Sequence, residues 1–224
     1  MTTLALFDLD HTLLPIDSDY EWGRYLVRRG VVDTASFEAR NAIFFRQYQD
    51  GTLDPVEYLE FALGTLAGFS REERDALHGD FMRDVITPAL LPQARALVRR
   101  HQDAGDLTAI VTATNRFVTA PIARAFGIDH LLAAEPELTV SGEMTGRLLG
   151  VPTSGHGKVV HTRDWLADMN KTLDGFERSY FYSDSHNDLP LMSIVTHPVA
   201  TNPNTPLTAH ATAHGWPILK LFND

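Results

Sequence analysis

The stretch that most constrains the fold lies almost at the amino terminus, where a short apolar run is followed at once by charge. Residues 4–7 are Leu-Ala-Leu-Phe, and the polar residues Asp8, Asp10 and Thr12 come directly after them. Four apolar residues with an abrupt polar end are typical of a buried strand and are too few for a helix. Because side chains alternate along a strand, Asp8 and Asp10 leave it on the same side. The sequence therefore predicts two carboxylates at the carboxyl end of a core strand.

Two carboxylates at this separation repel each other unless a cation lies between them. Mg²⁺ prefers a few carboxylates together with water and a phosphate oxygen, so the pair indicates phosphoryl chemistry. In this interpretation Asp8 is the nucleophile that accepts a phosphoryl group, and Asp10 is the general acid and base. Thr12 would hold the first carboxylate in line. The alternative is that these residues only cap a turn after the strand, because Asp and Thr favour such positions.

Composition narrows the class of protein. The chain has 224 residues, which allows one large domain or a core domain with a modest insert. Its net charge of -10 argues against a nucleic-acid partner and against an anionic membrane surface. Without cysteine there is no disulfide framework, thiolate nucleophile or cysteine-ligated metal. No run is long enough to span a bilayer and no secretory signal is evident, so the expected location is the cytoplasm.

The segment 17–86 has the apolar periodicity of helices and contains no clear strand. Several helical stretches follow one another, and Ser70 with Glu73 forms a capping box before the last of them. We interpret this block as an inserted all-helical cap domain. The core domain would then consist of residues 1–16 and 87–224.

From residue 92 the pattern alternates between helices and strands, which is typical of a parallel α/β sheet. A strand over 107–111 is followed by Thr112, which the pattern places at the start of a helix that ends near residue 127. Ligands bind such sheets at the carboxyl ends of strands, and a hydroxyl beside a helix amino terminus is an anion site. We therefore expect a three-layer, Rossmann-like core in which Thr112 binds phosphate. A purely capping role for Thr112 is the alternative.

A lysine and two further carboxylates are expected at the same edge of the sheet. Lys158 opens a helix, and its ammonium would neutralise phosphate oxygens and orient the nucleophile. Asp184 follows the strand 180–183 and would complete the metal site with the carboxylate of Asp8 and the backbone carbonyl of Asp10.

Two residues of the loop after that strand have supporting roles in this interpretation. Asp188 would buttress Lys158 or an ordered water, and Asn187 would offer its amide to the phosphate. The alternative is a helix with its N-cap at Asp188, which is compatible with the first role.

Four motifs, in this order along the chain, resemble those of the haloacid dehalogenase superfamily in its phosphatase branch: Asp8-x-Asp10-x-Thr12, Thr112 after a strand, Lys158, and Asp184-x-x-x-Asp188. The closer similarity is to the phosphoserine phosphatase-like subfamily, in particular its histidinol-phosphatase-like members, and it covers nearly the whole chain. The resemblance implies a Rossmann-like core with a helical cap, Mg²⁺ dependence and an aspartyl-phosphate intermediate. In phosphoserine phosphatases an acidic residue just after the first motif contacts the substrate amine, and Asp17 matches it by spacing.

The predicted function is Mg²⁺-dependent hydrolysis of a small phosphomonoester, for example histidinol phosphate or phosphoserine, under a cap that closes over the site. A phosphotransferase or mutase of the same fold differs only in the group that accepts the phosphoryl. A phospho-accepting signalling module also groups acids, a threonine and a lysine around Mg²⁺, although no large helical insert is expected there. The sequence predicts no particular oligomeric state.

Overall fold

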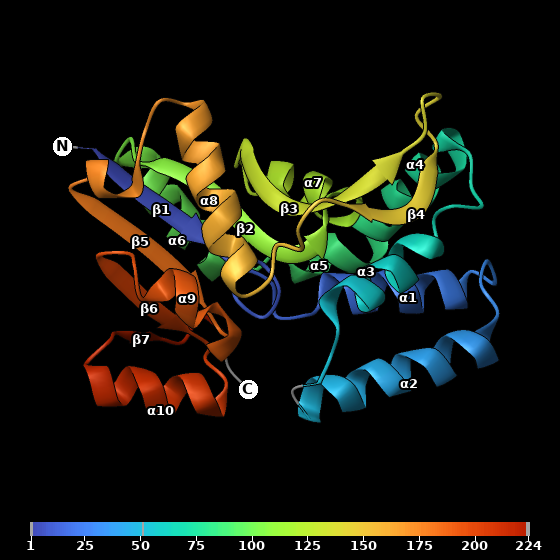
Figure 1. The fold of residues 1–224 in the computed structure, drawn as a ribbon, viewed down its shortest axis with the longest axis horizontal. Coiled ribbons are helices and arrows are strands. Elements are labelled where there is room, and N and C mark those ends of the chain that lie inside the picture. The colour runs from blue at the N-terminus through green and yellow to red at the C-terminus, as the bar shows by residue number, and fades with distance from the viewer. Residues whose placement is uncertain (1, 51, 223–224) are drawn as a thin grey trace.

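A computed structural model describes residues 2–50 and 52–222 of the chain. Its strands are β1 (Thr3–Phe7), β2 (Leu107–Asn115), β3 (His130–Leu138), β4 (Met144–Leu149), β5 (Arg178–Ser183), β6 (His197–Thr201) and β7 (Ile218–Leu219). They form one sheet in the order β4-β3-β2-β1-β5-β6-β7 (Figure 1). Neighbouring strands are parallel except β3 and β4, which form an antiparallel hairpin. The predicted α/β core is therefore confirmed.

Helices and helical turns connect these strands. They are α1 (Ser18–Arg28), α2 (Thr34–Asp50), α3 (Pro55–Gly64), α4 (Arg71–Phe81), the π-helical turn η1 (Met82–Ile86), α5 (Thr87–Ala89), α6 (Pro92–Asp103), α7 (Arg116–Ala125), α8 (His156–Asp168), η2 (Leu173–Gly175), η3 (His186–Asp188), α9 (Leu189–Met192) and α10 (Thr205–His214). None of the helices in the described ranges combines the length and the apolar character needed to cross a membrane. The expected cytoplasmic location stays a prediction.

The central strand β1 is buried on both faces, which produces the three layers. Its residues 4–7 have no exposed surface. Ala5 and Phe7 pack into a cluster with residues of α6, α7 and the helices that follow β1. Leu4 and Leu6 face the opposite cluster, to which α8, α9 and α10 contribute. Because successive side chains of a strand point to opposite faces, one short apolar run anchors both helical layers.

The predicted run of helices between β1 and α6 is present, and the predicted capping box at Ser70 and Glu73 begins α4. Trp22 of α1 and Phe81 of α4 belong to the same buried cluster as Phe7 of the sheet. These helices therefore share a core with the sheet face that they cover. The division of the chain into a core domain and a cap domain stays a prediction.

The segment after residue 111 differs from the sequence expectation. We expected a helix to begin at Thr112, but β2 continues to Asn115 with a register shift against β3 between Val111 and Asn115. Asn115 is the N-cap of α7, and its side chain accepts from the Val118 amide at 3.1 Å. The β-branched residues before Asn115 favour a strand, and an asparagine favours an N-cap, so the local preferences agree with the observed boundary.

A buried histidine network lies on the sheet face covered by α6. His101 is 5% exposed, with Nδ1 2.7 Å from Asp106 Oδ2 and Nε2 2.8 Å from the Tyr182 hydroxyl. Burial lowers the pKa of His101 below its ordinary value of 6.5, although Asp106 opposes the shift. The unfolded chain therefore binds a proton more readily at this residue than the folded chain does. The stability that neutral His101 contributes is lost as the pH falls below about 6.5.

Replacing His101 with glutamine tests whether protonation of this residue lowers the stability of the fold. The variant loses part of the network and is expected to be less stable than the wild type by about 1–3 kcal/mol near neutral pH. Because only the wild type is destabilised by protonation at this position, the difference should narrow as the pH falls below about 6.5. Urea unfolding of both proteins at a series of pH values measures that difference. A difference that is constant or widens toward acid would contradict the prediction.

Candidate active site

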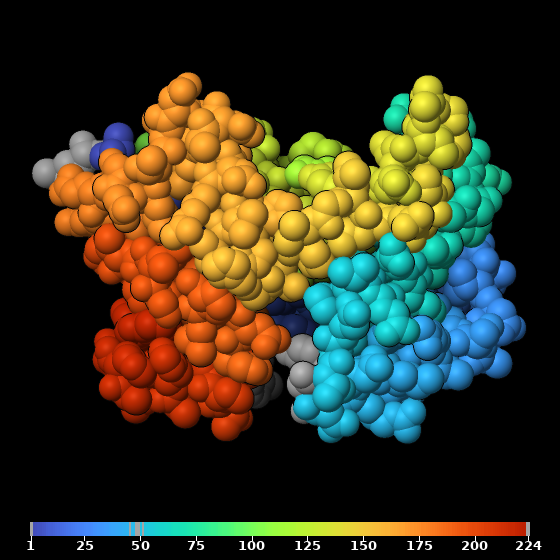
Figure 2. Space-filling view, viewed as in Figure 1, coloured from blue at the N-terminus to red at the C-terminus, as the bar shows by residue number. Residues whose placement is uncertain are grey.

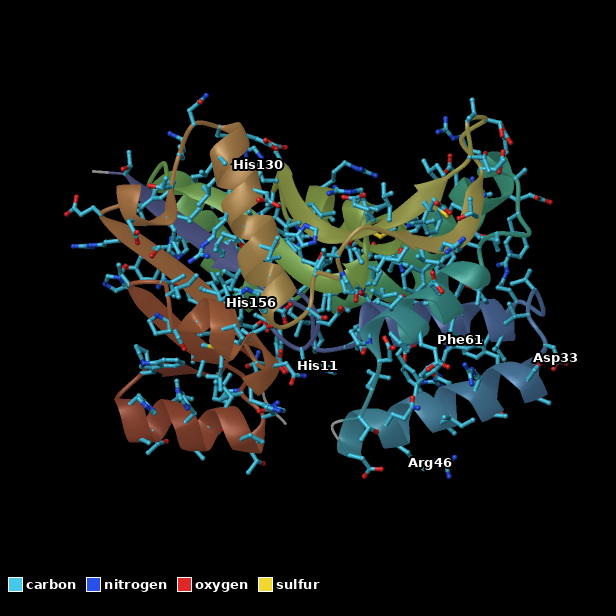
Figure 3. All side chains as sticks on the ribbon, in the orientation of Figure 1. His11, Asp33, Arg46, Phe61, His130 and His156 are labelled. Atoms are coloured by element: carbon cyan, nitrogen blue, oxygen red, sulfur yellow. The ribbon has the colours of Figure 1, made fainter. Side chains whose placement is uncertain are left out.

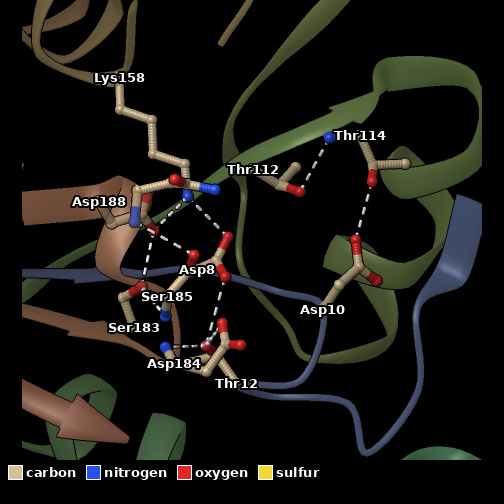
Figure 4. A network of polar contacts seen from close by, with 11 residues as sticks. Asp8, Asp10, Thr12, Thr112, Thr114, Lys158, Ser183, Asp184, Ser185 and Asp188 are labelled. Atoms are coloured by element: carbon tan, nitrogen blue, oxygen red, sulfur yellow. Dashed lines mark hydrogen bonds and ion pairs between the residues drawn. The ribbon is translucent and has the colours of Figure 1, made fainter. Parts of the chain in front are cut away.

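The first carboxylate lies at the carboxyl edge of the sheet, in the network drawn in Figure 4. Asp8 follows β1 directly and is 7% exposed. Its backbone amide donates to the Tyr182 carbonyl at 2.9 Å. Lys158 Nζ donates to Asp8 Oδ1 at 2.8 Å, and Thr12 Oγ1 donates to Asp8 Oδ2 at 3.3 Å. One carboxylate oxygen faces a cation and the other a hydroxyl, so the orientation of the group is fixed.

Lys158 reaches this edge from the first turn of α8 and is almost completely buried. Its Nζ also donates to Asp188 Oδ2 at 2.6 Å, and Ser183 Oγ donates to the same oxygen at 2.7 Å. Burial alone lowers the pKa of Lys158, but the charges of Asp188 and Asp8 outweigh burial and hold that pKa above its ordinary value. Lys158 is therefore a fixed positive charge that pairs with both Asp8 and Asp188.

Asp184 follows β5 and shares the Thr12 hydroxyl with Asp8. Its backbone amide donates to Thr12 Oγ1 at 3.0 Å, and Asp184 Oδ1 lies 3.2 Å from the same oxygen. Burial raises the pKa of Asp184 to about 8, and the charge of Asp8 adds to the shift. Two carboxylates joined through one hydroxyl form a site where a bound cation would favour the ionised state of both.

The donor set at this edge fits a hard cation. Among the described residues, no group of three or more His, Asp or Glu side chains is arranged to hold a metal ion. For a bound cation, Asp8 and Asp184 would supply two side-chain oxygens, and the remaining ligands would be the Asp10 carbonyl, water and phosphate. A few carboxylates completed by water and a phosphate oxygen are the surroundings that Mg²⁺ prefers.

The side chain of Asp10 makes contacts separate from those of Asp8 (Figure 4). The backbone amide of Ser18, at the start of α1, donates to Asp10 Oδ1 at 2.7 Å. Thr114 Oγ1, at the end of β2, donates to Asp10 Oδ2 at 2.8 Å. Burial raises the pKa of Asp10 to about 6, the charge of Asp17 adds to the shift, and the bonds from Ser18 and Thr114 oppose it. A carboxyl with this pKa can exchange a proton near neutral pH.

The other residues predicted for the site have different surroundings. Thr112 is buried in β2, three residues before the strand ends, and its Oγ1 accepts from the Thr114 amide at 3.2 Å. Asn187 is exposed in η3, and its backbone amide donates to Ser185 Oγ at 3.2 Å. Asp17 is the N-cap of α1, where its Oδ1 accepts from the Tyr20 amide at 2.9 Å. Their roles toward a substrate stay predictions.

Sequence reasoning missed Thr114 and the Ser18 amide, the two groups that hold the Asp10 carboxylate. Thr114 lies two residues after Thr112 on one strand, so alternation along a longer β2 would have placed both on the same side. The sequence holds no such signal for the Ser18 amide, because the position of that amide depends only on how α1 approaches the loop.

The carboxylate network lies near a hollow in the molecular surface. Figure 2 shows this hollow between α2 and α3 on one side and the segment after β5 on the other, with the dark blue amino-terminal segment at its base. Figure 3 places His11 and His156 on the side of the hollow that belongs to the sheet and its helices. The hollow therefore borders the loop that carries Asp8, Asp10 and Thr12, because His11 belongs to that loop.

Comparison with known proteins extends the similarity to almost the whole chain. A model of the haloacid dehalogenase-like hydrolase family matches residues 5–193. The histidinol-phosphatase of Neisseria meningitidis serogroup C is 43% identical over 219 residues, which cover 98% of this chain and 99% of that protein. The phosphoserine phosphatase SerB1 of Mycobacterium tuberculosis is 33% identical over 221 residues, covering 97% of this chain and 70% of that protein.

A solved structure agrees with these relationships. A protein of unknown function from Bordetella pertussis Tohama I superposes with a TM-score of 0.95 at 52% identity, covering 99% of this chain and all of that one. The family model spans the four motifs up to Asp188, and the Neisseria relative matches 98% of the chain. The chain therefore belongs to the haloacid dehalogenase-like hydrolase family, in its phosphatase branch.

Proposed function

We propose that this protein is a Mg²⁺-dependent phosphomonoesterase that transfers a phosphoryl group first to Asp8 and then to water. The observation that carries the proposal is the fixed Asp8 carboxylate, which lies between Lys158 Nζ at 2.8 Å and the Thr12 hydroxyl at 3.3 Å. A carboxylate held beside a buried cation is well placed to attack a dianionic phosphate, because the cation offsets the repulsion between the two anions.

In the first step an Asp8 oxygen attacks phosphorus in line with the ester bond. The bond between phosphorus and the alcohol oxygen breaks, and Asp10 gives its proton to the leaving alcohol. In the second step Asp10 takes a proton from water, whose oxygen attacks the phosphoryl group on Asp8. Inorganic phosphate leaves, and both carboxyl groups return to their starting states.

The chain's own cationic and hydroxyl groups hold the substrate during both steps. Lys158 neutralises phosphate oxygens, and Thr112 donates its hydroxyl to them from β2. Asp8, Asp184 and the Asp10 carbonyl would hold Mg²⁺, with Thr12 and Asp188 fixing the groups around it. Bound Mg²⁺ supplies charge that draws the phosphate in and stabilises the negative charge of the transition state.

Two substrates are supported by the relatives. Histidinol phosphate is favoured, because the Neisseria histidinol-phosphatase matches over 98% of this chain and 99% of its own length. Phosphoserine is the second candidate, because the SerB1 relative also spans 97% of this chain, although at lower identity. Both are small phosphomonoesters, which agrees with the size of substrate expected under a helical cap.

Phosphate release tests the function and its dependence on metal. The purified protein should release phosphate from histidinol phosphate with Mg²⁺, and EDTA should reduce the rate at least about 100-fold, since the charge that stabilises the transition state is removed. Added Mg²⁺ should restore the rate.

The same assay separates the competing functions. Transfer to an added alcohol in place of water would identify a phosphotransferase. A phosphorylated Asp8 that persists for minutes would identify a signalling module. Rates that EDTA leaves unchanged would overturn the metal dependence.

A further inference from the structure

A pair of histidines near the carboxyl end of the chain has no part in the proposed active site. His210 and His214 lie four positions apart on α10, which Figure 1 shows beside β7. Residues at this spacing are neighbours on one side of a helix. Their rings stack with centroids 4.0 Å apart and planes 18° apart. Because His210 is only half-buried and His214 is exposed, the pair is open to solvent.

The ring of His214 has the tautomer of a metal ligand. Its Nδ1 lies 2.8 Å from the backbone carbonyl oxygen of His210, so in the neutral ring Nδ1 carries the proton and donates to that oxygen. The lone pair is then on Nε2, where it can bind an ion. Histidines that bind metals almost always donate their other ring nitrogen to a carbonyl, a carboxylate or water in this way.

Trp216 packs against both rings. Its ring centroid lies 4.8 Å from that of His210 and 6.0 Å from that of His214. Gly215 ends α10 in the left-handed conformation, and the Trp216 amide then donates to the Ala211 carbonyl at 2.9 Å. The turn after the helix therefore returns an indole to the histidine pair. Side chains that are restrained before an ion binds lose less entropy when it does.

The spacing of the two rings suits a transition-metal ion. Bonds from such an ion to imidazole nitrogens are about 2.0–2.1 Å long, so one ion can join two nitrogens that are at most about 4 Å apart. Two nearly parallel rings 4.0 Å apart meet this limit with a small side-chain rotation. Within the described ranges, no third His, Asp or Glu joins the pair, so water would complete the coordination.

We propose that His210 and His214 form a surface site for a late first-row transition-metal ion, with Cu²⁺ bound most tightly. Imidazole suits Cu²⁺, Ni²⁺ and Zn²⁺, and a tetragonal set of nitrogen and water ligands is typical of Cu²⁺ and Ni²⁺. Within this series Cu²⁺ forms the strongest complexes with such ligands. Mg²⁺ requires oxygen ligands and should not bind here.

This metal site is distinct from the proposed Mg²⁺ site in position as well as in donor atoms. The N-cap of α10 is Asn204, whose backbone amide donates to the Asp184 carbonyl at 2.8 Å. His210 and His214 lie six and ten residues further along the chain, which is about 9 and 15 Å along a helix at 1.5 Å per residue. Both ions can therefore bind at once, and the histidine site does not depend on the proposed phosphatase activity.

A helix cap is the competing role for His214. A histidine in the last turn of a helix can donate to one of the last carbonyls, and its positive form interacts favourably with the helix dipole. Capping requires His214 alone, whereas a chelate requires both imidazoles. Dependence of metal binding on both His210 and His214 therefore distinguishes the two roles.

Tryptophan fluorescence can report binding, because Cu²⁺ quenches it at short range and Trp216 lies beside the pair. The protein is saturated with Mg²⁺ and then titrated with Cu²⁺. We expect His210→Gln and His214→Gln each to weaken the binding that quenches Trp216 by about 100-fold, since the second ligand of the chelate is lost. The control His197→Gln removes an exposed histidine of β6 and should leave this binding unchanged.

Two further measurements assign the signal. The chain also contains Trp22 and Trp165, so only the quenching that Trp216→Phe removes belongs to this site. Calorimetric titration with Cu²⁺ requires no tryptophan and should show one tightly bound ion fewer per chain when both His210 and His214 are replaced with glutamine.

The outcomes are decisive for the histidine site alone. Equal Cu²⁺ binding by the wild type and the double variant would overturn the proposal, as would a loss in only one of the two single variants. Tighter binding of Mg²⁺ than of Cu²⁺ at this site would also overturn it. Phosphate release by His214→Gln should equal that of the wild type, so a failure of the proposed phosphatase function would leave this test unaffected.

Discussion

Replacing Asp8 with asparagine is expected to reduce phosphate release by about 10⁴-fold or more, because the variant lacks the proposed nucleophile. An amide has the shape of the carboxylate but does not form the acyl phosphate. Its Oδ1 can still accept from Lys158, which lies 2.8 Å from Asp8 Oδ1. The loss should therefore appear in kcat rather than in folding.

The fold should tolerate this substitution because the surrounding charges remain paired. Lys158 keeps its contact with Asp188 at 2.6 Å. The pKa of Asp184, raised first by burial and then by the charge of Asp8, should fall in the variant, which relieves the repulsion in the metal-free site. Thermal unfolding should show a change of about 1 kcal/mol or less.

A control at the surface completes the test of Asp8. Asp84→Asn makes the same chemical change at an exposed residue of η1 that pairs with Arg83, and it should keep full activity. If Asp8→Asn retained more than about a tenth of the wild-type rate, the phosphoryl group would have to pass to another acceptor. Detection of a phosphorylated peptide that contains Asp8 in the wild type alone provides the direct evidence.

The part of the site that the sequence predicted follows from strand ends. Asp8 and Asp184 each come directly after a short apolar run, and these runs form the neighbouring parallel strands β1 and β5. Neighbouring parallel strands have their carboxyl ends at one edge of the sheet. Asp8 and Asp184, which are 176 positions apart in the sequence, therefore share the Thr12 hydroxyl. Lys158 could be placed there because it opens a helix that returns to the same edge.

The parts that the sequence did not predict depend on tertiary register. β2 continues past Val111 with a register shift against β3, and Thr114 in this added part of the strand donates to Asp10. The same limit applies to Asp17 and Asp19. Either carboxylate suits the start of α1, and only the packing of α1 against Asn115 turns Asp19 inward while Asp17 caps the helix.

Gly157→Ala is expected to have the largest effect on stability of the glycine substitutions in this chain. A Cβ atom at Gly157 would lie 1.9 Å from the backbone oxygen of Pro152 and 3.1 Å from its carbonyl carbon. Backbone atoms cannot turn aside as a flexible side chain can, so the start of α8 must move away from the preceding loop. We expect a loss of about 3 kcal/mol or more in the free energy of unfolding.

The same displacement should lower activity, because Lys158 is the next residue and its Nζ must stay 2.8 Å from Asp8. A shift of about 1 Å in such a group reduces the rate by about 100-fold. Gly79→Ala is the matched control, since Gly79 lies in α4 with no atom within 4 Å of the added methyl, and it should raise stability by about 0.5–1 kcal/mol. Urea unfolding and phosphate release measured on both variants separate the two effects. Equal stability of Gly157→Ala and the wild type would mean that α8 does not approach Pro152 so closely, and Lys158 would then need another means of support.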